Sequence, residues 1–196
     1  MKRAPGGYTD PIVTTTNNQP FLTDVKELRR RARESIEKGA LTADYGLDVN
    51  QAIELLQGAL ATEIVCVLRY TMHSIAASGI SSEGVKDEFA QHASEEREHM
   101  EQIAERINQL GGTPNFNPEG LLTRSASEYG KNDLDLVGMI KENLVAERIA
   151  IEHYRELIAF FGDKDSTTRT MLEEILAVEE EHANDMSDLL GSHAGK

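Results

Sequence analysis

The sequence predicts an all-α protein whose main body is an antiparallel four-helix bundle, and three observations support this fold class. Ala, Leu, Ile, Glu and Arg are plentiful, whereas aromatic residues make up 5% of the 196 residues and Trp is absent, a composition that favours helix. Four segments of about 25–30 residues, bounded by glycine, proline or capping residues, have the length of bundle helices. No segment sustains the strict apolar–polar alternation of a half-buried strand.

The chain begins with a segment that differs in character from the bundle. Residues 1–22 are rich in Gly, Pro, Thr and Asn and are expected to form an extended arm. Asp24 and Glu27 have the spacing of a capping box, which predicts a short helix ending near Gly39 and then a loop. The predicted organisation is an N-terminal arm with a short helix over 1–47, the bundle over 48–191 and a tail over 192–196.

The first two bundle helices are separated by a short link. The first is expected to begin near Asp48, with Gln51 at its third position, and to stop before Gly79. The second is expected over residues 82–110, where a pair of glycines follows. Because the link is short, these two helices are predicted to form an antiparallel hairpin.

The last two helices follow a long connection. Residues 111–132 are interrupted by prolines and glycines and predict a crossover, with a short helical turn near residues 121–129. The third helix is expected over 133–161 and the fourth over 166–190, where Gly191 is expected to close it. The crossover allows the second hairpin to pack against the first.

The charge and the cysteine content of the chain argue against several classes of function. The formal charge is −14, divided into +1 over residues 1–50 and −15 over residues 51–196, so nucleic acid is not an obvious partner of the main body. Cys66 is the only cysteine, which excludes an intramolecular disulfide, a CxxC motif and a cysteine-based zinc site. The sequence shows no continuous apolar run of about eighteen residues and no secretory-type apolar core at its start, so we expect a cytoplasmic protein without a membrane span.

Two Glu-x-x-His pairs, each preceded by a lone glutamate, dominate the sequence. The separation from the lone glutamate to its pair differs by a single position between the two copies, and a tyrosine follows each lone glutamate at the same spacing, two helical turns later. The same unit therefore occurs twice along the chain. Its members are Glu63, Tyr70, Glu96 and His99 in the first copy, and Glu147, Tyr154, Glu179 and His182 in the second.

This pattern predicts a site for two metal ions. Positions i, i+3 and i+7 share one helix face, so the members on each helix point the same way, among apolar neighbours. Four carboxylates in a bundle core would each cost several kcal/mol without compensation, and two divalent cations would balance their charge. Oxygen-rich ligation with one imidazole per ion suits iron or manganese, and zinc also accepts such ligands.

At these residues the chain resembles the ferritin superfamily. The segments ATEIVCVLRY, EEREH, LVAERIAIEHY and VEEEH are most similar to the bacterioferritin-type ferroxidase centre, and the combination of Glu and Glu-x-x-His is characteristic of ferritin-like di-iron proteins. The resemblance covers about residues 48–190 and implies a ferritin-like bundle with two iron ions per subunit. The implied roles are Glu63 and Glu147 as terminal ligands, Glu96 and Glu179 as bridges, His99 and His182 as one imidazole per ion, and Tyr70 and Tyr154 as supports of the ligands.

The resemblance implies iron storage and detoxification. Two Fe(II) ions would be oxidised by O₂ or H₂O₂, and the ferric product would be stored as mineral inside a hollow homo-oligomeric shell. Arg97 occupies the position of the haem-ligating methionine of bacterioferritins, and Met100 lies on a different azimuth, so we expect no haem. Rubrerythrins carry a further glutamate where this chain has Ala150, and a cysteine-rich module that one cysteine cannot supply. Because only five residues follow Gly191, the fifth helix of 24-subunit ferritins is not expected, which favours twelve subunits of the Dps-like type.

Other polar residues near the motif are expected to have ordinary roles. We interpret Cys66 as a buried inert thiol. The basic stretch from Lys26 to Arg33 is interrupted by glutamates, so a docking helix between subunits is favoured over DNA binding. The neighbouring acidic residues are expected to be mainly solvated, with guidance of iron inward by a minority of them as the less favoured alternative. The three remaining histidines near the site helices are expected to be ordinary polar or interface residues. The acidic residues are Glu95, Glu98, Glu101, Glu180 and Glu181, and the histidines are His73, His92 and His153.

Two other functions fit the same residues. A peroxide-removing enzyme with two iron or two manganese ions would use the site without accumulating mineral. A DNA-protecting shell of the Dps type would use metal only to stabilise the bundle.

Overall fold

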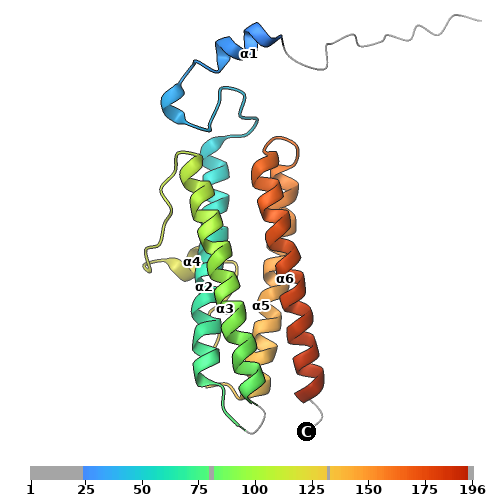
Figure 1. Ribbon diagram of the computed structural model, residues 1–196. Helices are drawn as coiled ribbons and strands as arrows, with labels where there is room; N and C mark the ends of the chain where they lie inside the picture. The colour runs from blue at the N-terminus through green and yellow to red at the C-terminus, as the bar shows by residue number, and fades with distance from the viewer. Residues whose placement is uncertain (1–23, 80–81, 132, 194–196) are drawn as a thin grey trace, which may run out of the picture.

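The structure, a computed structural model, describes residues 24–79, 82–131 and 133–193. Within these ranges every regular element is helical, which confirms the all-α prediction (Figure 1). In chain order the elements are α1 (Val25–Arg31), the short 3₁₀ helix η1 (Ile36–Lys38), α2 (Val49–Ala76), α3 (Ser82–Gln109), α4 (Leu121–Arg124), α5 (Leu136–Phe161) and α6 (Ser166–His193).

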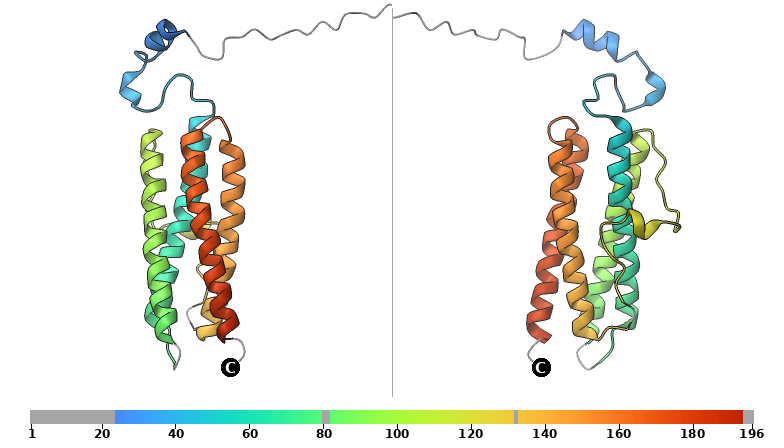
Figure 2. Two further views of the ribbon diagram at one scale, coloured as in Figure 1. Left: turned by 45° about the vertical axis from the view of Figure 1, so that its right-hand side comes forward. Right: turned by 180° about the vertical axis from the view of Figure 1, so that it is seen from behind.

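Helices α2, α3, α5 and α6 form the predicted four-helix bundle. The closest packing pairs α2 with α3 and α5 with α6, so the bundle consists of two antiparallel hairpins. The connection from α3 to α5 runs along the outside of α2 and includes α4, which also packs against α2 (Figure 2). This connection is the predicted long crossover. Helix α1 lies beyond one end of the bundle.

Acidic residues cap the first helix of each hairpin. Oδ1 of Asp48 accepts a hydrogen bond from the backbone N of Gln51 at 2.9 Å, which confirms the predicted start of α2. Oδ1 of Asp135 accepts one from the backbone N of Gly138 at 2.7 Å. Because Asp135 is the cap, α5 begins at Leu136 and not at residue 133 as predicted.

The predicted end of the last helix is wrong. Helix α6 continues through Gly191 to His193, because Gly191 keeps a helical backbone and does not adopt the positive φ that ends a helix. Ser192 Oγ donates a hydrogen bond to the carbonyl oxygen of Leu189 at 2.8 Å, which helps to satisfy the last turn. Residues 194–196 of the predicted tail lie outside the described residues.

The short N-terminal helix also differs from its prediction. It ends at Arg31 rather than near Gly39, and η1 follows it. Oδ1 of Asp24 accepts from the backbone N of Lys26 at 2.6 Å, whereas Glu27 pairs with arginines of its own helix instead of completing a capping box. The arm predicted over residues 1–22 lies outside the described residues.

Two of the three apolar clusters in the described residues follow each other along the bundle axis, and the third lies where Leu121 of α4 packs on α2. Of the first two, one contains Leu60 of α2 and Ile103 of α3, and the other contains Tyr70 of α2 and Phe89 of α3. The Glu and His residues of the repeated motif lie between these levels on all four helices, so apolar layers close the centre of the bundle at both ends. Helix α2 is the one described helix long and apolar enough to suit a membrane span, but it is packed within the bundle.

A buried ion pair joins α3 to the start of α6. Nη2 of Arg106 lies 2.9 Å and 3.0 Å from the two carboxylate oxygens of Asp165, and Nε of Arg106 donates to Oγ1 of Thr168 at 2.7 Å. The hydroxyl of Tyr45 donates to Oδ2 of Asp165 at 2.8 Å. This network fixes the loop before α2 to the ends of two bundle helices.

Replacing Arg106 with Met should destabilise the protein by about 3 kcal/mol, because the carboxylate of Asp165 would remain buried without its cation. For a chain of this length the thermal midpoint should decrease by about 6–12 °C. Arg155→Met is the matched control, since Arg155 pairs with Glu180 at 2.7 Å on the surface, with 54% of its side chain exposed. Equal shifts in the two variants, measured at one protein concentration, would contradict a special role for the buried pair.

Candidate metal centre

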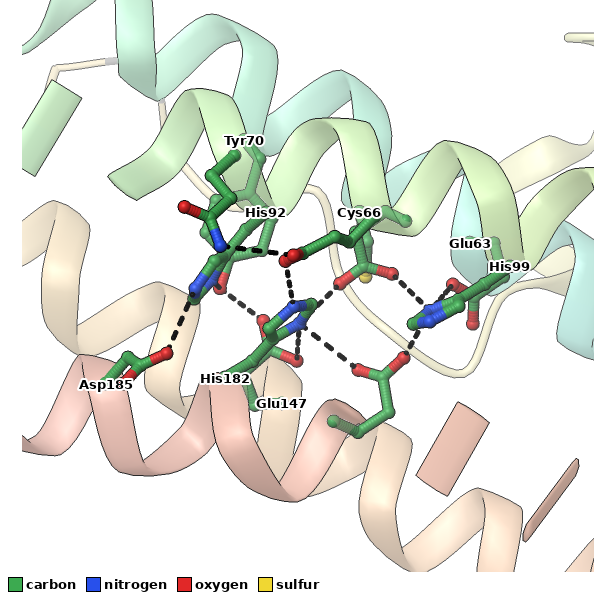
Figure 3. A network of polar contacts seen from close by, with 12 residues as sticks. Glu63, Cys66, Tyr70, His92, His99, Glu147, His182 and Asp185 are labelled. Carbon is green, nitrogen blue, oxygen red and sulfur yellow. Dashed lines mark hydrogen bonds and ion pairs between the residues drawn. The ribbon is translucent and has the colours of Figure 1, made fainter. Parts of the chain in front are cut away.

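The four bundle helices bring the six predicted Glu and His residues together between the two apolar clusters (Figure 3). Each hairpin contributes one lone glutamate from its first helix and one Glu-x-x-His pair from its second. All six side chains are buried, and the most exposed residue, His99, retains only 4% of its accessible surface. They are Glu63 on α2, Glu96 and His99 on α3, Glu147 on α5, and Glu179 and His182 on α6.

The six residues form two overlapping groups of four. Within each group the candidate ligand atoms all lie within 4.8 Å of one another. Glu96 and Glu179 belong to both groups. The first group adds Glu63 and His99, and the second adds Glu147 and His182.

Each shared glutamate presents one oxygen to each histidine. Nδ1 of His99 lies 3.7 Å from Oε2 of Glu96 and 2.9 Å from Oε1 of Glu179. Nδ1 of His182 lies 3.5 Å from Oε1 of Glu96 and 4.0 Å from Oε2 of Glu179. The two shared carboxylates therefore face both halves of the site, which is the arrangement that two bridged ions require.

The unshared glutamates complete the two halves. Oε2 of Glu63 lies 3.6 Å from Nδ1 of His99, and Oε2 of Glu147 lies 3.9 Å from Nδ1 of His182. Each half thus presents three carboxylate oxygens and one imidazole nitrogen.

Eight atoms that face the centre of this site are buried and have no well-directed hydrogen bond. Buried polar atoms are normally hydrogen-bonded, and each exception costs about 1–3 kcal/mol, or more when the group is charged. Two divalent ions would supply the missing partners and would match the four negative charges. The residues present therefore fit a pair of oxygen-preferring ions such as iron or manganese. The eight atoms are Glu63 Oε2, Glu96 Oε1 and Oε2, His99 Nδ1, Glu147 Oε2, Glu179 Oε1 and Oε2, and His182 Nδ1.

Without metal, burial favours protons on three of the four glutamates, whereas contacts with both histidines keep the pKa of Glu96 below its ordinary value. Burial and then the charge of Glu96 raise the pKa of Glu63 to about 8. The same two causes raise the pKa of Glu147 and of Glu179. For His182 burial opposes the charged ring, but its contacts with Glu96 and the charge of Glu147 outweigh it and raise the pKa to about 9. Metal binding at neutral pH must therefore displace protons.

The two tyrosines support the site crosswise between the hairpins. Tyr70 of α2 donates a hydrogen bond to Oε1 of Glu147 on α5, and Tyr154 of α5 donates to Oε1 of Glu63 on α2. Each hydrogen bond occupies one glutamate oxygen and leaves the other, Oε2, directed at the site.

Sequence reasoning missed two residues beside His182. Oε2 of Glu95, expected to be a solvated neighbour, lies 2.8 Å from Nε2 of His182 and can orient that ring. The ring of His92, expected to be an ordinary polar residue, is fully buried and stacks on His182 with the ring centroids 3.9 Å apart. His92 precedes Glu96 by one helical turn and His99 by two, so its position on the motif face was the available signal.

A polar pocket of about 290 Å³ opens over His99 between α3 and α6. Ile175 and Val178 form part of its wall. Four glutamates line it and make the approach to His99 strongly negative: Glu95, Glu98, Glu174 and Glu181.

Cys66 lies close to the site but is not exposed to solvent. Its burial and the charge of Glu96 raise the pKa of the thiol well above its ordinary value, and its Sγ lies 3.9 Å from Nη2 of Arg69. A buried thiol with a raised pKa is chemically inert at neutral pH.

A family model described as ferritin-like domain matches residues 53–194 of this chain. The chain belongs to the ferritin superfamily. This ferritin-like chain is 30% identical over 147 residues to the DNA protection during starvation protein of Pyrococcus furiosus, and the alignment covers 74% of this chain and 80% of that protein. It is 28% identical over 145 residues to the nutrient stress-induced DNA-binding protein of Synechococcus, with 72% and 81% covered.

A solved structure shows the same relationship at the level of the fold. The dodecameric thioferritin of Bacteroides fragilis, described as a bacterioferritin-related protein, is 36% identical and has a TM-score of 0.73, and the match covers 76% of this chain and 89% of that one. Together these relatives confirm the predicted assignment to the Dps-like and bacterioferritin-related part of the superfamily.

Metal binding by the ferritin-like chain should weaken as the pH decreases. Glu63 with a pKa of about 8 and His182 with a pKa of about 9 are protonated at pH 6 and must release those protons to bind an ion. For each of these two protons the affinity for Zn(II) should therefore decrease by about five- to tenfold per pH unit from pH 8 to pH 6. Calorimetry in buffers of different ionisation enthalpy should show proton release, and a pH-independent affinity would contradict the protonated site.

The contribution of Glu63 to the stability of the metal-free protein should decrease as the pH increases, whereas the affinity for metal should increase. The raised pKa of Glu63 contributes stability that is fully present below its ordinary value of 4.5 and is lost as the pH increases through about 8. The increase in thermal midpoint on adding Zn(II) should therefore be larger at pH 8 than at pH 5.

Replacing Tyr154 or Tyr70 with Phe should lower the affinity for Zn(II) by about 10–100-fold, because the supported glutamate loses the hydrogen bond that orients it. Tyr129→Phe is the matched control, since Tyr129 lies in the crossover, away from the site. Titration with Zn(II) at constant pH measures the effect, and unchanged affinity in both site variants would exclude the supporting role.

Proposed function

We propose that this chain oxidises Fe(II) at the central site and stores the ferric product as mineral inside a homo-oligomeric cage. The observation that carries the proposal is the set of eight buried, inward-facing oxygen and nitrogen atoms without hydrogen-bond partners. Membership of the family supports iron storage or DNA protection in general. The site of this chain favours iron oxidation, because its ligand set suits two Fe(II) ions as substrate.

In the proposed centre each ion has its own terminal ligands and shares two bridges. Glu63 and His99 would hold one ion, and Glu147 and His182 the other. The bridging carboxylates would be Glu96 and Glu179, whose two oxygens face opposite halves of the site. Manganese or zinc would fit the same ligands.

The oxidation is a two-electron reaction shared by two ions. Each Fe(II) loses one electron, and the pair reduces O₂ with two protons to H₂O₂, or H₂O₂ with two protons to two molecules of water. The protein's part is to hold both ions within reach of one oxidant, to keep the glutamate oxygens oriented through Tyr70 and Tyr154, and to exclude bulk water with the apolar clusters.

The pocket over His99 is the proposed entrance for Fe(II). Its glutamates give it a strongly negative potential, which concentrates cations at its mouth. In this proposal Glu98 and Glu181 attract the substrate, which was the less favoured of the two roles that the sequence suggested for them.

We further propose a cage of twelve subunits in the cytoplasm. The thioferritin that this chain matches at 36% identity is described as dodecameric. The single cysteine fits a reducing compartment.

DNA binding is a second candidate because two relatives are named for it. The basic residues of α1 argue against it. Arg30 pairs with Glu27 at 2.7 Å and with Glu34 at 2.5 Å, and Arg31 pairs with Asp44, so acidic neighbours offset much of the positive charge. A peroxide-removing enzyme with two iron or manganese ions is the other alternative, and it would not accumulate mineral.

Replacing both Glu147 and Glu179 with Ala should slow Fe(II) oxidation by more than about 100-fold, since even outer partners of metal ligands contribute 10–100-fold. Glu180→Ala is the matched control, because Glu180 adjoins Glu179 but lies on the surface, with 48% of its side chain exposed. The increase in ferric absorbance after aerobic addition of Fe(II) measures the rate. Wild-type rates in the double variant would show that oxidation occurs elsewhere.

Size-exclusion chromatography of the iron-loaded protein tests the cage. Each chain has a mass of 21.7 kDa, so the protein shell should elute with twelve times that mass, and a shell of twenty-four chains would be twice as heavy. Storage predicts many irons per subunit that elute with the particle. Uptake that stops at two irons per subunit would instead favour the peroxide-removing enzyme.

A further inference from the structure

A second cluster of potential metal ligands lies beside the central site and shares no ligand with it. It consists of Glu88 and His92 on α3 and Asp185 on α6, whose candidate ligand atoms all lie within 4.8 Å of one another. Figure 3 shows His92 between the central site and Asp185. The proposed iron chemistry makes no use of Glu88 or Asp185.

The orientation of His92 is set by its contact with Tyr70. Nδ1 of His92 lies 3.2 Å from the hydroxyl oxygen of Tyr70, and that hydroxyl donates its own hydrogen to Glu147. The tyrosine oxygen is therefore the acceptor, and Nδ1 of His92 carries the hydrogen that it receives. This leaves the lone pair on Nε2.

Nε2 of His92 points at two carboxylates without forming a hydrogen bond. It lies 3.3 Å from Oε1 of Glu88 and 3.5 Å from Oδ2 of Asp185, and it is buried without a hydrogen-bond partner, on a residue that is fully buried. A nitrogen lone pair facing two carboxylates is repulsive unless a cation lies between them. The observation therefore points to a ligand.

The distances fit coordination of one small ion. Two ligand atoms each about 2.1 Å from an ion lie about 3.4 Å apart at the tetrahedral angle and about 3.0 Å apart at the octahedral angle. The two measured distances, 3.3 Å and 3.5 Å, match the tetrahedral value. One imidazole and two carboxylates with a fourth position open to water are a ligand set that zinc and other divalent transition metals accept.

The cluster has both an inner support and an open side. A metal-bound histidine usually donates its other ring N–H to a polar group, and Nδ1 of His92 does so to Tyr70. On the outer side Glu88 and Asp185 line a surface pocket of about 310 Å³ together with Asp188, Leu189 and Ser192. Water and an incoming ion can therefore reach the carboxylates.

The internal repeat shows that the bundle does not need these polar residues. When the two Glu-x-x-His pairs are aligned in sequence, Glu88 corresponds to Met171 and His92 to Ile175. The other hairpin packs apolar side chains at the same positions beside its own motif, where Ile175 belongs to the apolar core. The polar pair is therefore specific to one half of the molecule.

We propose that Glu88, His92 and Asp185 form a third cation site for a divalent transition metal such as Zn(II), adjacent to the central site. Nε2 of His92 and one oxygen from each carboxylate bind the ion, and water from the pocket completes its coordination. The chain of contacts from His92 through Tyr70 to Glu147 connects this site to the central one.

Equilibrium dialysis of the full-length metal-free protein against micromolar Zn(II) tests the proposal by counting ions per subunit. Wild-type protein should bind three, and Asp185→Asn or Glu88→Gln should bind two. Asp188→Asn should still bind three, because Asp188 lines the same pocket but is outside the cluster. Two ions in wild-type protein would overturn the proposal and would indicate an ion pair between a protonated His92 and the carboxylates. Three ions in Asp185→Asn would overturn it by showing that the third ion binds elsewhere.

A second experiment distinguishes an ion at this site from an ion at the central site. The double variant Glu147→Ala and Glu179→Ala should retain an ion that disappears when Asp185→Asn is added, and anomalous diffraction from zinc-loaded crystals should place that ion between His92 and the two carboxylates. An anomalous peak only at the central site would refute the third site. The rate of Fe(II) oxidation is measured in a separate assay. Failure of the third-site proposal therefore does not contradict the proposed iron oxidation, and failure of the proposed iron oxidation does not contradict the third site.

Discussion

The burial of four carboxylates in the middle of the bundle is the constraint on which the rest of the structure depends. Each would be costly to bury alone, and together they repel one another. Two imidazoles lie among these carboxylates, and tyrosine hydroxyls hold one oxygen of Glu63 and one of Glu147. The other six carboxylate oxygens and the two histidine Nδ1 atoms face the centre of the site. The apolar clusters above and below exclude water, and this makes compensation by cations effective.

The repeated unit gives the site an approximate twofold symmetry, but the residues around its two halves differ. The crosswise bonds from Tyr70 to Glu147 and from Tyr154 to Glu63 tie each hairpin to the other, so the two halves of the chain are held together at the site itself. Around His182 the neighbours are polar, with His92 stacked on its ring. Around His99 the corresponding neighbours are apolar and an acidic pocket opens instead. The two halves therefore offer different environments to chemically similar ligand sets.

The bundle and the convergence of the six Glu and His side chains were predictable because helical geometry fixes which side chains share a face. Spacings of three and seven residues need no tertiary information, and capping by Asp48 is local as well. The partner of each tyrosine was not predictable, since it depends on how the hairpins pack. The role of Glu95 was hidden because five acidic residues near the motifs look alike in sequence, and only packing brings this one to Nε2 of His182. The prediction that Gly191 ends the last helix was wrong, because glycine permits a helix end without requiring one.

Protons on the buried glutamates reduce the negative charge of the core in the metal-free protein. Burial raises the pKa of Glu63, Glu147 and Glu179, which favours those protons. Divalent ions bound at the proposed centre would displace those protons and take over their role. If protons leave as the cations enter, the total charge of the centre changes far less than it would if two cations were added and no protons left. Under the proposed function, the bundle would load and release ions without passing through a state in which four ionised carboxylates face one another unpaired.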